Sequence, residues 1–500
     1  MFSTGELVVI TIPGTLLVAT VLSGLTSSRI GRAVTLLASL IVLLVSSWYA
    51  FAIEKHPLEH YMVAEEFILD PLAAWLLLAI SITGFASALH SWGYIDRELE
   101  HGRLTENDCR LYYALFNIFM LTMVLSAMFN NIFLIWVAIE ATTLASAFLV
   151  GIYGSRESLE AAWKYVILCS LGLVFSLYGT SILYSNAVGI TGSWSKATLW
   201  SSLVVEAGSL SPGLLKLAFI TLLIGYGTKA GLAPLHTWLP DAHAEAPAPI
   251  SSLLSGVLVK CAIIVLARFT ALMFAANLGS FASPVLLALG LLSLWIGALV
   301  ILVSKDVKRM LAFSTIENIG LIATGLALGS LVATKGAILH VLSHGMAKSS
   351  LFLMSGLLML IYGTRDMSRM RDLYNTHKIL AVMLLLGGIA TAGLPPFLVF
   401  ISELSIIMGS VDSGALIVFL ILGGLAVGFA GLLRHLFRII FLTEEHHHGT
   451  RGKRESVNLP LSSLAAVMFL IILLLLLGIF MPSNLSMLLN YASSEVVGNV

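Results

Sequence analysis

Charged residues are scarce in this chain of 500 residues, at 11%, whereas hydrophobic residues make up 58%. A soluble domain carries roughly 25% charged residues. The composition therefore excludes an ordinary soluble protein and indicates a chain embedded in a lipid bilayer. Basic and acidic residues balance, so that the formal net charge is zero. No excess of positive charge supports binding to nucleic acid, and we expect none.

Several signatures of cofactor chemistry are also missing. The three cysteines, Cys109, Cys169 and Cys261, form no CxxC pair, which argues against an iron–sulfur cluster. No Walker or GxGxxG phosphate loop lies between a strand and a helix, so ATP is not expected as the energy source. We therefore expect neither a cofactor nor a metal in this chain. The first apolar run has no Lys or Arg before it, and we expect a retained span.

Long apolar runs dominate what is present. A membrane-spanning helix needs about 20 apolar residues. The sequence contains about fourteen such runs, at roughly 6–26, 31–53, 67–90, 111–129, 131–152, 160–187, 214–232, 248–274, 284–304, 309–329, 334–361, 379–407, 413–441 and 461–481. The predicted fold class is an all-α integral membrane protein with about fourteen transmembrane helices.

The basic residues of the loops indicate how these spans are oriented. Loops after odd-numbered spans carry most of them, such as Arg365, Arg369 and Arg371, whereas loops after even-numbered spans carry few. By the positive-inside rule the odd-numbered loops are cytoplasmic. We therefore expect a multi-pass protein of the cytoplasmic membrane with both termini outside.

Two short motifs recur in the same order. The AIE motif ending at Glu140 resembles the TIE motif ending at Glu317, and AGLAP at 230–234 resembles AGLPP at 392–396. Spans four to eight and nine to thirteen are therefore predicted to be duplicates. Because each unit holds an odd number of spans, the two repeats are inverted, as in many secondary transporters.

The repeat predicts both the organisation of the chain and two helix breaks. We expect helices 1–3 in residues 1–110, the first five-helix repeat in 111–274, the second in 275–441, and a cytoplasmic loop with helix 14 in 442–500. Proline interrupts a helix, so Pro234 is expected to break helix 7. Pro395 and Pro396 are expected to break helix 12. Matching broken helices point to an ion site.

A set of titratable residues lies inside the apolar runs. A charged side chain at membrane depth costs at least a few kcal/mol, so it is usually paired, solvated or functional. We interpret the set as a proton path made of Glu140, Lys229, Lys260, His340, His344, Lys348 and Glu403. The two histidines and Lys348 follow each other at intervals of four residues and share one helical face.

Each of these assignments has an alternative. Glu140 could form a structural hydrogen bond between helices. Lys229 could extend to a nearby loop at the membrane surface. His340, His344 and Lys348 could form a structural network. The two histidines could also bind a metal, although no third ligand is near in sequence. Arg268, nearer a span end than Lys260, is expected to be a surface anchor.

Five further residues are secondary candidates. Glu317, the repeat counterpart of Glu140, either shares its role or pairs with the basic residues that precede it. Lys164 lies one turn inside its span, where a contact with Glu140 is expected. The loop after span seven is surrounded by His236, Asp241 and His243, which form either a cytoplasmic proton entrance or a tie between two helices. The sequence at 444–448, EEHHH, is expected to be a solvated cytoplasmic loop.

Four segments together resemble one protein family. They are residues 231–260, 313–320 (FSTIENIG), 340–353 (HVLSHGMAKSSLFL) and 393–404 (GLPPFLVFISEL). They are similar to the antiporter-like subunits of respiratory complex I, of Mrp-type cation/proton antiporters and of membrane-bound group 4 NiFe hydrogenases. The resemblance extends over spans four to thirteen, and the IENIG sequence favours the hydrogenase branch.

The resemblance implies a fourteen-helix fold with a repeated five-helix unit. It also implies a Glu–Lys pair at Glu140 and Lys229, a central lysine at Lys260, a terminal carboxylate at Glu403, and a histidine stripe ending at Lys348. One departure is Ala347, where the family usually has a bulky residue. Family members have been assigned both protons and sodium ions, so the resemblance leaves the transported ion open.

The leading hypothesis is a proton-translocating subunit of a redox-driven membrane complex of the hydrogenase or complex I type. Its expected partners are other membrane subunits, including further antiporter-like subunits, a peripheral redox arm and lipid. Iron–sulfur clusters, and a NiFe centre in a hydrogenase, would lie in the partners. The alternative is a sodium/proton antiporter subunit of an Mrp-type assembly. A scaffold without transport is disfavoured by the retained charged residues.

Overall fold

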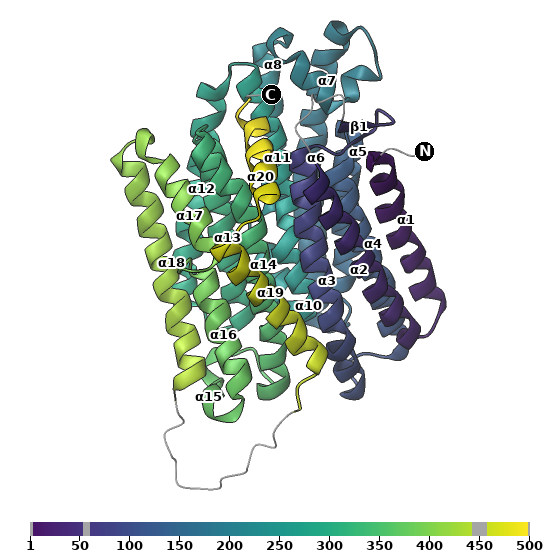
Figure 1. The fold of residues 1–500 in the computed structure, drawn as a ribbon, viewed down its shortest axis with the longest axis vertical. Helices are drawn as coiled ribbons and strands as arrows, with labels where there is room; N and C mark the ends of the chain where they lie inside the picture. Colours follow the sequence, from purple (N-terminus) through teal and green to yellow (C-terminus); the bar gives the residue numbers. More distant parts are fainter. Residues whose placement is uncertain (1–3, 54–60, 443–457, 499–500) are drawn as a thin grey trace.

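A computed structural model describes residues 4–53, 61–442 and 458–498, which fold almost entirely into helices (Figure 1). Thirteen of the helices in this described part are long and apolar enough to cross a bilayer. The strands found there, β1 (Met62–Val63) and β2 (Phe67–Ile68), form one short antiparallel hairpin. The chain is therefore an all-α integral membrane protein, as predicted.

The helices follow the predicted order of spans. The first group is α1 (Thr4–Leu25), α2 (Ser28–Ala52) and α3 (Pro71–Glu100). The second is α4 (Glu106–Met128), α5 (Ile132–Val150), α6 (Arg156–Thr191), α7 (Trp200–Val205), α8 (Pro212–Ala230), α9 (Leu239–Glu245), α10 (Ala248–Leu253) and α11 (Val259–Ala275), with a π-turn, η4 (Leu254–Leu258), between the last two. The third is α12 (Gly279–Val303), α13 (Val307–Ala327), α14 (Leu331–Tyr362), α15 (Leu373–Thr376), α16 (Lys378–Thr391), α17 (Leu398–Gly409) and α18 (Ala415–Phe441), followed by α19 (Leu461–Ile479) and α20 (Ser483–Val497).

Polar residues at the helix starts explain where many of the helices begin. The side chain of Asn131 accepts hydrogen bonds from the first turn of α5, and Asp306 does the same for α13. At α4, Thr105 and Asp108 form a reciprocal capping box. These side chains satisfy backbone N–H groups that the helix itself leaves without partners. The loops between spans can therefore be short.

The two proline breaks lie where the sequence predicts them. Helix α8 ends at Gly231, which adopts a left-handed conformation (φ +81°), and Pro234 lies between α8 and α9. Pro395 and Pro396 lie between α16 and α17 in the same way. The predicted span 379–407 is therefore two half-helices, α16 and α17.

The two glutamate-bearing helices of the repeats run in opposite directions. Helix α5 begins where Asn131 pairs with Leu199, beside α7 at the upper end of the bundle in Figure 1. Helix α13 begins where Asp306 pairs with Asp366, at the lower end near α15. This arrangement agrees with inverted repeats.

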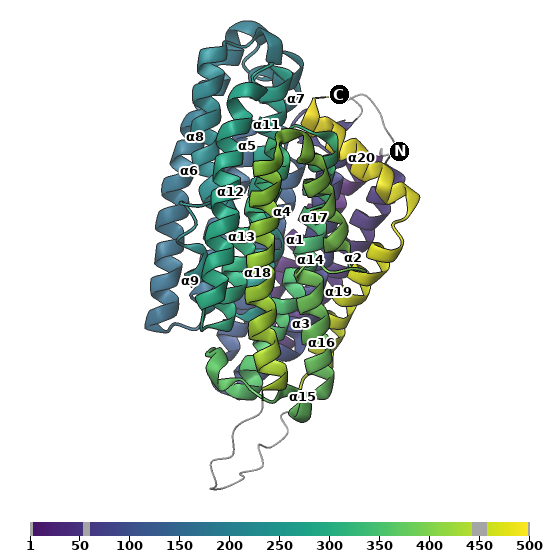
Figure 2. The same ribbon diagram turned by 90° about the vertical axis from the view of Figure 1, so that its left-hand side faces the viewer.

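The last predicted span, 461–481, corresponds to α19, but it is followed by a helix that was not predicted. Helix α19 ends at Ile479, and the chain continues after Pro482 into a further helix, α20. Helix α1 begins and α20 ends at the upper end of the bundle (Figures 1 and 2), as an even number of crossings requires. The expected solvated loop at 444–448 lies outside the described residues.

The most deeply buried helices lie at the centre of the bundle. In α10–α11 every residue of the most apolar 18-residue stretch is buried. In the corresponding stretches of α1 and of α18, only 28% of the residues are buried. Helix α14 packs against α3, α13, α17 and α19. The titratable residues of the predicted path lie mostly on these central helices, away from the lipid-facing periphery.

A buried ion pair joins α3 to α11. Arg268 donates to both carboxylate oxygens of Asp70, at 2.6 and 2.9 Å, and its guanidinium lies over the Trp200 ring. Asp70 also accepts from the Ala73 N–H and so caps α3. Because Arg268 is only 4% exposed, the expectation of a surface anchor is wrong. The residue connects two helices inside the protein.

Replacing Arg268 by alanine should destabilise the protein strongly, because it leaves the Asp70 carboxylate buried without its partner. Breaking a buried ion pair costs about 3–5 kcal/mol. Thermal unfolding in detergent would measure the loss. The matched control is Arg97→Ala, which removes an exposed pair with Glu100 and should cost about 0–1 kcal/mol. Equal shifts for the two variants would contradict a stabilising role for the pair.

Candidate functional site

Lys229 lies in the last turn of α8 and is fully buried. Its Nζ donates to Thr143 Oγ1 on α5 and to the Tyr165 hydroxyl on α6, each at 2.7 Å. The ammonium also lies 4.8 Å from the centre of the Tyr165 ring. Because it points into the protein, Lys229 is not a lysine extending to the membrane surface.

Glu140 lies near Lys229 but does not contact it directly in this structure. Its Oε1 accepts a hydrogen bond of 2.6 Å from Ser170 on α6, and its Oε2 is buried without a hydrogen-bond partner among the described residues. The expected Glu–Lys pair is therefore separated here, with each partner held by a hydroxyl group. The free carboxylate oxygen shows that Glu140 has unused capacity to accept a hydrogen bond.

Aromatic contacts hold the end of α8 in place beside the break. Trp238, which follows the break, stacks on Tyr165 with ring centres 4.6 Å apart. Its indole N–H donates to the carbonyl of Thr228 at 2.8 Å. This carbonyl, in the last turn of α8, also accepts a hydrogen bond from the Gly231 N–H. Trp238 therefore fixes Lys229 and Tyr165 relative to each other.

Lys260 follows directly on the π-turn η4. Its Nζ donates to the backbone carbonyl of Ser255, inside that turn, and the Ser255 hydroxyl lies 2.6 Å from Thr315 Oγ1 on α13. A π-turn is rare and often lies at a functional site, because its wider ring disturbs the normal backbone pairing. Here the turn supplies an oxygen acceptor to a fully buried lysine.

The face of α14 carries the histidine stripe. Both ring nitrogens of His340 are hydrogen-bonded, to Ser402 Oγ at 2.9 Å and to Asn318 Oδ1 at 2.8 Å. His344 stacks on His340 with ring centres 5.3 Å apart. Neither nitrogen of His344, nor Lys348 Nζ, has a hydrogen-bond partner in the described part of the chain. Donors and acceptors are therefore available along this face, as the spacing predicted.

Glu317 and Glu403 line one small cavity between α13, α16, α17 and α18. Its volume is about 20 Å³, and Ser314, Asn318 and Thr391 also line it. A cavity of this size holds about one water molecule. Gly393 and Gly428 make room for the two carboxylates, since a Cβ at Gly393 would overlap Glu403 and one at Gly428 would overlap Glu317. The secondary candidate Glu317 thus belongs to the same site as Glu403.

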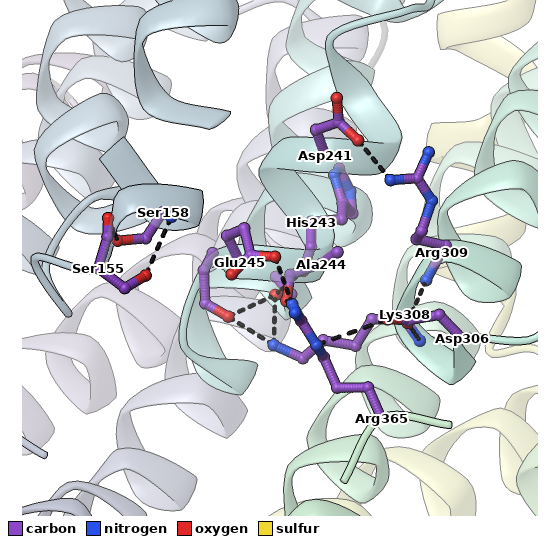
Figure 3. A network of polar contacts seen from close by, with 12 residues as sticks. Ser155, Ser158, Asp241, His243, Ala244, Glu245, Asp306, Lys308, Arg309 and Arg365 are labelled. Atoms are coloured by element: carbon purple, nitrogen blue, oxygen red, sulfur yellow. Dashed lines mark hydrogen bonds and ion pairs between the residues drawn. The ribbon is translucent and has the colours of Figure 1, made fainter. Parts of the chain in front are cut away.

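The secondary candidates at the lower end of the bundle form a tie between helices (Figure 3). Asp241 on α9 pairs with Arg309 on α13 at 2.5 Å and with Lys164 on α6 at 3.5 Å. Lys164 also pairs with Glu160 and does not reach Glu140, so that expected contact is wrong. Two alternatives were predicted for Asp241, a proton entrance and a tie between two helices, and the geometry agrees with the tie.

Burial disfavours the charged form of the two histidines beside this tie. Burial lowers the pKa of His243 to about 3, and it also lowers the pKa of His236. The Nδ1 of His243 lies 2.9 Å from the carbonyl of Leu239, whereas its Nε2 has no partner among the described residues. His243 therefore keeps one ring nitrogen without a partner among the described residues.

Sequence reasoning missed Lys308, which was treated only as a loop charge. The side chain is buried, and its Nζ donates to the carbonyl of Ala246 at the end of α9. Arg365 binds the same segment through the Ala244 carbonyl and Glu245. The signal available in the sequence, a cluster of basic residues, could not separate Lys308 from its exposed neighbours. The hydroxyl partners Thr143 and Tyr165 were missed as well.

The charges of the central residues affect one another. Lys348 interacts electrostatically with Glu317 and with Lys260, and Glu403 interacts with Glu317. Lys260, Lys348, Glu317 and Glu403 are therefore near enough to influence one another's charge. Within residues 4–53, 61–442 and 458–498, no group of three His, Cys, Asp or Glu side chains is arranged to hold a metal.

Fold and site together define a multi-helix membrane protein with titratable side chains buried in its interior, and comparisons identify its family. The family described as "NADH:quinone oxidoreductase/Mrp antiporter, TM" matches residues 129–429, more than half of the chain. The chain belongs to this family.

Individual relatives come from more than one kind of membrane complex. The Hydrogenase-4 component F homolog of Methylacidiphilum infernorum is 36% identical over 417 residues, covering 83% of this chain and 86% of the relative. An Na(+)/H(+) antiporter subunit of Alkalihalophilus pseudofirmus is 29% identical, covering 76% of this chain and 74% of the relative. A chain of the archaeal membrane-bound sulfane sulfur reductase complex superposes with a TM-score of 0.84 at 25% identity, covering 99% of this chain and 98% of that one.

Replacing Gly428 by alanine should move the Glu317 carboxylate without unfolding the protein. The new methyl group would overlap a carboxylate oxygen, but this oxygen ends a flexible side chain that can rotate away. Infrared spectroscopy of the carboxyl band, assigned with Glu317→Gln, would detect the change.

The matched control for this test is Gly189→Ala, because a Cβ at Gly189 would have no neighbour within 4 Å. It should leave the carboxyl band unchanged. A Gly428→Ala protein with an unaltered Glu317 band would contradict the described position of this carboxylate.

Proposed function

We propose that this chain is a proton-translocating subunit of a redox-driven membrane complex of the hydrogenase or complex I type. The observation that carries the proposal is that Lys229, Lys260 and Lys348 are all fully buried without an ion-pair partner in the described part of the chain. An unpaired ammonium in an apolar interior is costly. Such a lysine binds or releases a proton when its surroundings change.

The separated Glu140 and Lys229 suggest how the path is controlled. A carboxylate close to a lysine favours the charged ammonium, and its withdrawal favours release of the proton. Here Glu140 is bound to Ser170 and Lys229 to Thr143 and Tyr165, an arrangement that fits the withdrawn state. The released proton would pass towards Lys260.

From Lys260 the path would continue along α14. His344 and Lys348 both have free polar atoms among the described residues, and water between them would relay the proton to the cavity of Glu317 and Glu403. Energy would arrive from partner subunits as a conformational or electrostatic change that shifts Glu140. The redox chemistry, with iron–sulfur clusters and in a hydrogenase a NiFe centre, belongs in this proposal to those partners.

The assembly and orientation belong to the same proposal. The chain would lie in the cytoplasmic membrane with both termini outside, so that the lower end in Figure 1, which carries the Asp241–Arg309 tie, faces the cytoplasm. Further antiporter-like subunits, a peripheral redox arm and lipid would surround it.

A second candidate function is a sodium/proton antiporter subunit of an Mrp-type assembly. The similarity to the Na(+)/H(+) antiporter of Alkalihalophilus pseudofirmus and the two carboxylates in one cavity favour it, because carboxylate oxygens bind hard cations. In that case an ion gradient, and not electron transfer, would supply the energy.

Replacing Lys229 by alanine should abolish ion transport while leaving assembly intact, because the amine that binds the proton is lost. Proton uptake into proteoliposomes containing the purified complex would measure it. The matched control is Lys216→Ala on the same helix, where the lysine contacts the Phe281 ring near the other end of α8. Normal pumping by an assembled Lys229→Ala complex would refute the proposed path.

Purifying the intact complex through this chain separates the two candidate functions. Mass spectrometry in mild detergent should find iron–sulfur and hydrogenase-like subunits if the complex is redox-driven. A complex made only of small membrane subunits, with transport that requires a sodium gradient, would instead establish the Mrp-type alternative.

A further inference from the structure

A basic pocket opens at the lower end of the bundle, away from the proposed proton path. It lies between the end of α12, the end of α18 and the turn at Met367–Arg369. Its volume is about 360 Å³, far larger than a single water molecule requires. The charged or titratable residues that line it are Lys305, Asp366, Arg434, His435 and Arg438. The pocket therefore has the size and the charge to accept a polar group from outside the chain.

Within residues 4–53, 61–442 and 458–498, the positive charge of this pocket is not neutralised by ion pairs. Lys305, Arg434 and Arg438 take part in no ion pair in the described part of the chain. The one acidic lining residue, Asp366, accepts a hydrogen bond from the Ser368 N–H at 2.9 Å and lies 3.8 Å from Arg369 outside the pocket. Arg434 and Arg438 are four residues apart on α18 and so share one face. The lining thus carries three cations and only one carboxylate, which is already engaged.

The walls of the pocket are fixed by contacts between α12 and α18. His435 Nε2 lies 3.1 Å from the carbonyl of Ile301, and the Trp295 indole N–H donates to the carbonyl of Leu420 at 3.1 Å. On the third side, the Met367 N–H donates to the Lys305 carbonyl at 2.9 Å. Basic groups are therefore presented by a rigid framework, which reduces the entropy cost of binding.

The two helices that form the basic pocket also carry exposed apolar side chains. On α12 these are Leu299 and Val303, and on α18 they are Leu422 and Phe429. Helices α12 and α18 lie side by side at the edge of the bundle (Figure 2). A ligand that fits both parts has an anionic head and long apolar chains. Free phosphate matches only the first of these features.

We propose that this pocket binds the phosphodiester headgroup of an anionic phospholipid, with its acyl chains along α12 and α18. Arginine recognises phosphate oxygens through paired N–H donors. Basic pockets between transmembrane helices on the cytoplasmic side bind anionic headgroups in this way. The proposal concerns a lipid site and does not depend on which ion the protein transports.

The full-length protein in lipid nanodiscs tests the proposal. Native mass spectrometry would count phosphatidylglycerol molecules that stay bound after delipidation with phosphatidylcholine. The double variant R434Q/R438Q should retain this lipid roughly 25-fold less well, at about fivefold for each basic residue near a membrane surface. Both arginines are exposed and have no ion-pair partner among the described residues, so folding should not change.

Three comparisons complete the test. The control R156Q removes an exposed arginine at the start of α6, outside the pocket, and should not alter retention. Restoring the charge with R434K/R438K should recover most of the binding. Inorganic phosphate at millimolar concentration should not displace the lipid, because it lacks the acyl chains. The proposal would be overturned if R434Q/R438Q and R156Q retained the lipid equally. It would also be overturned if phosphatidylcholine bound as well as phosphatidylglycerol, or if phosphate displaced the lipid.

Discussion

The cost of holding an ammonium group in an apolar interior governs this structure. Burying an isolated charge is expensive unless polar partners replace its water. Three fully buried lysines meet that cost in different ways: Lys229 has hydroxyl groups, Lys260 has a backbone carbonyl, and Lys348 has only the nearby charge of Glu317 among the described residues. The irregular parts of the fold lie beside these lysines. The break after α8 adjoins Lys229, and the π-turn adjoins Lys260 and supplies the carbonyl that its ammonium binds.

The two repeats use the same architecture with different chemistry. The AGLAP and AGLPP motifs place Thr391 in the second half where Lys229 stands in the first. The amine is therefore absent from the second break, and Thr391 instead lines the cavity of Glu317 and Glu403. Glu140 has a lysine nearby, whereas its counterpart Glu317 shares a cavity with another acid. The first break therefore adjoins a lysine, whereas the second adjoins a pair of acids.

The sequence allowed the fold to be predicted well because the relevant signals are local. Apolar runs marked the spans, and Pro234 and Pro395 marked the breaks. The candidate residues were found because charge inside an apolar run is rare. Their partners were not found, since Thr143, Ser170 and Tyr165 are ordinary helix residues whose role depends on how α5, α6 and α8 pack. The π-turn before Lys260 leaves no mark in hydrophobic periodicity, because α10 and α11 are apolar on all sides. Arg268 and Lys308 resembled membrane-surface residues, and only tertiary contacts show that they are buried.

Helix α9 joins the two halves mechanically. At one end Trp238 is bonded to the last turn of α8, and Asp241 is paired with α13 and α6. At the other end, Lys308 of α13 holds the carbonyl of Ala246. Because α9 is short and is bonded to both α8 and α13, a displacement of one of these helices is passed on to the other. A shift of α13 along its axis must therefore either break these contacts or pull α9, and with it the end of α8 that carries Lys229. The two repeats cannot move independently while α9 stays attached to both.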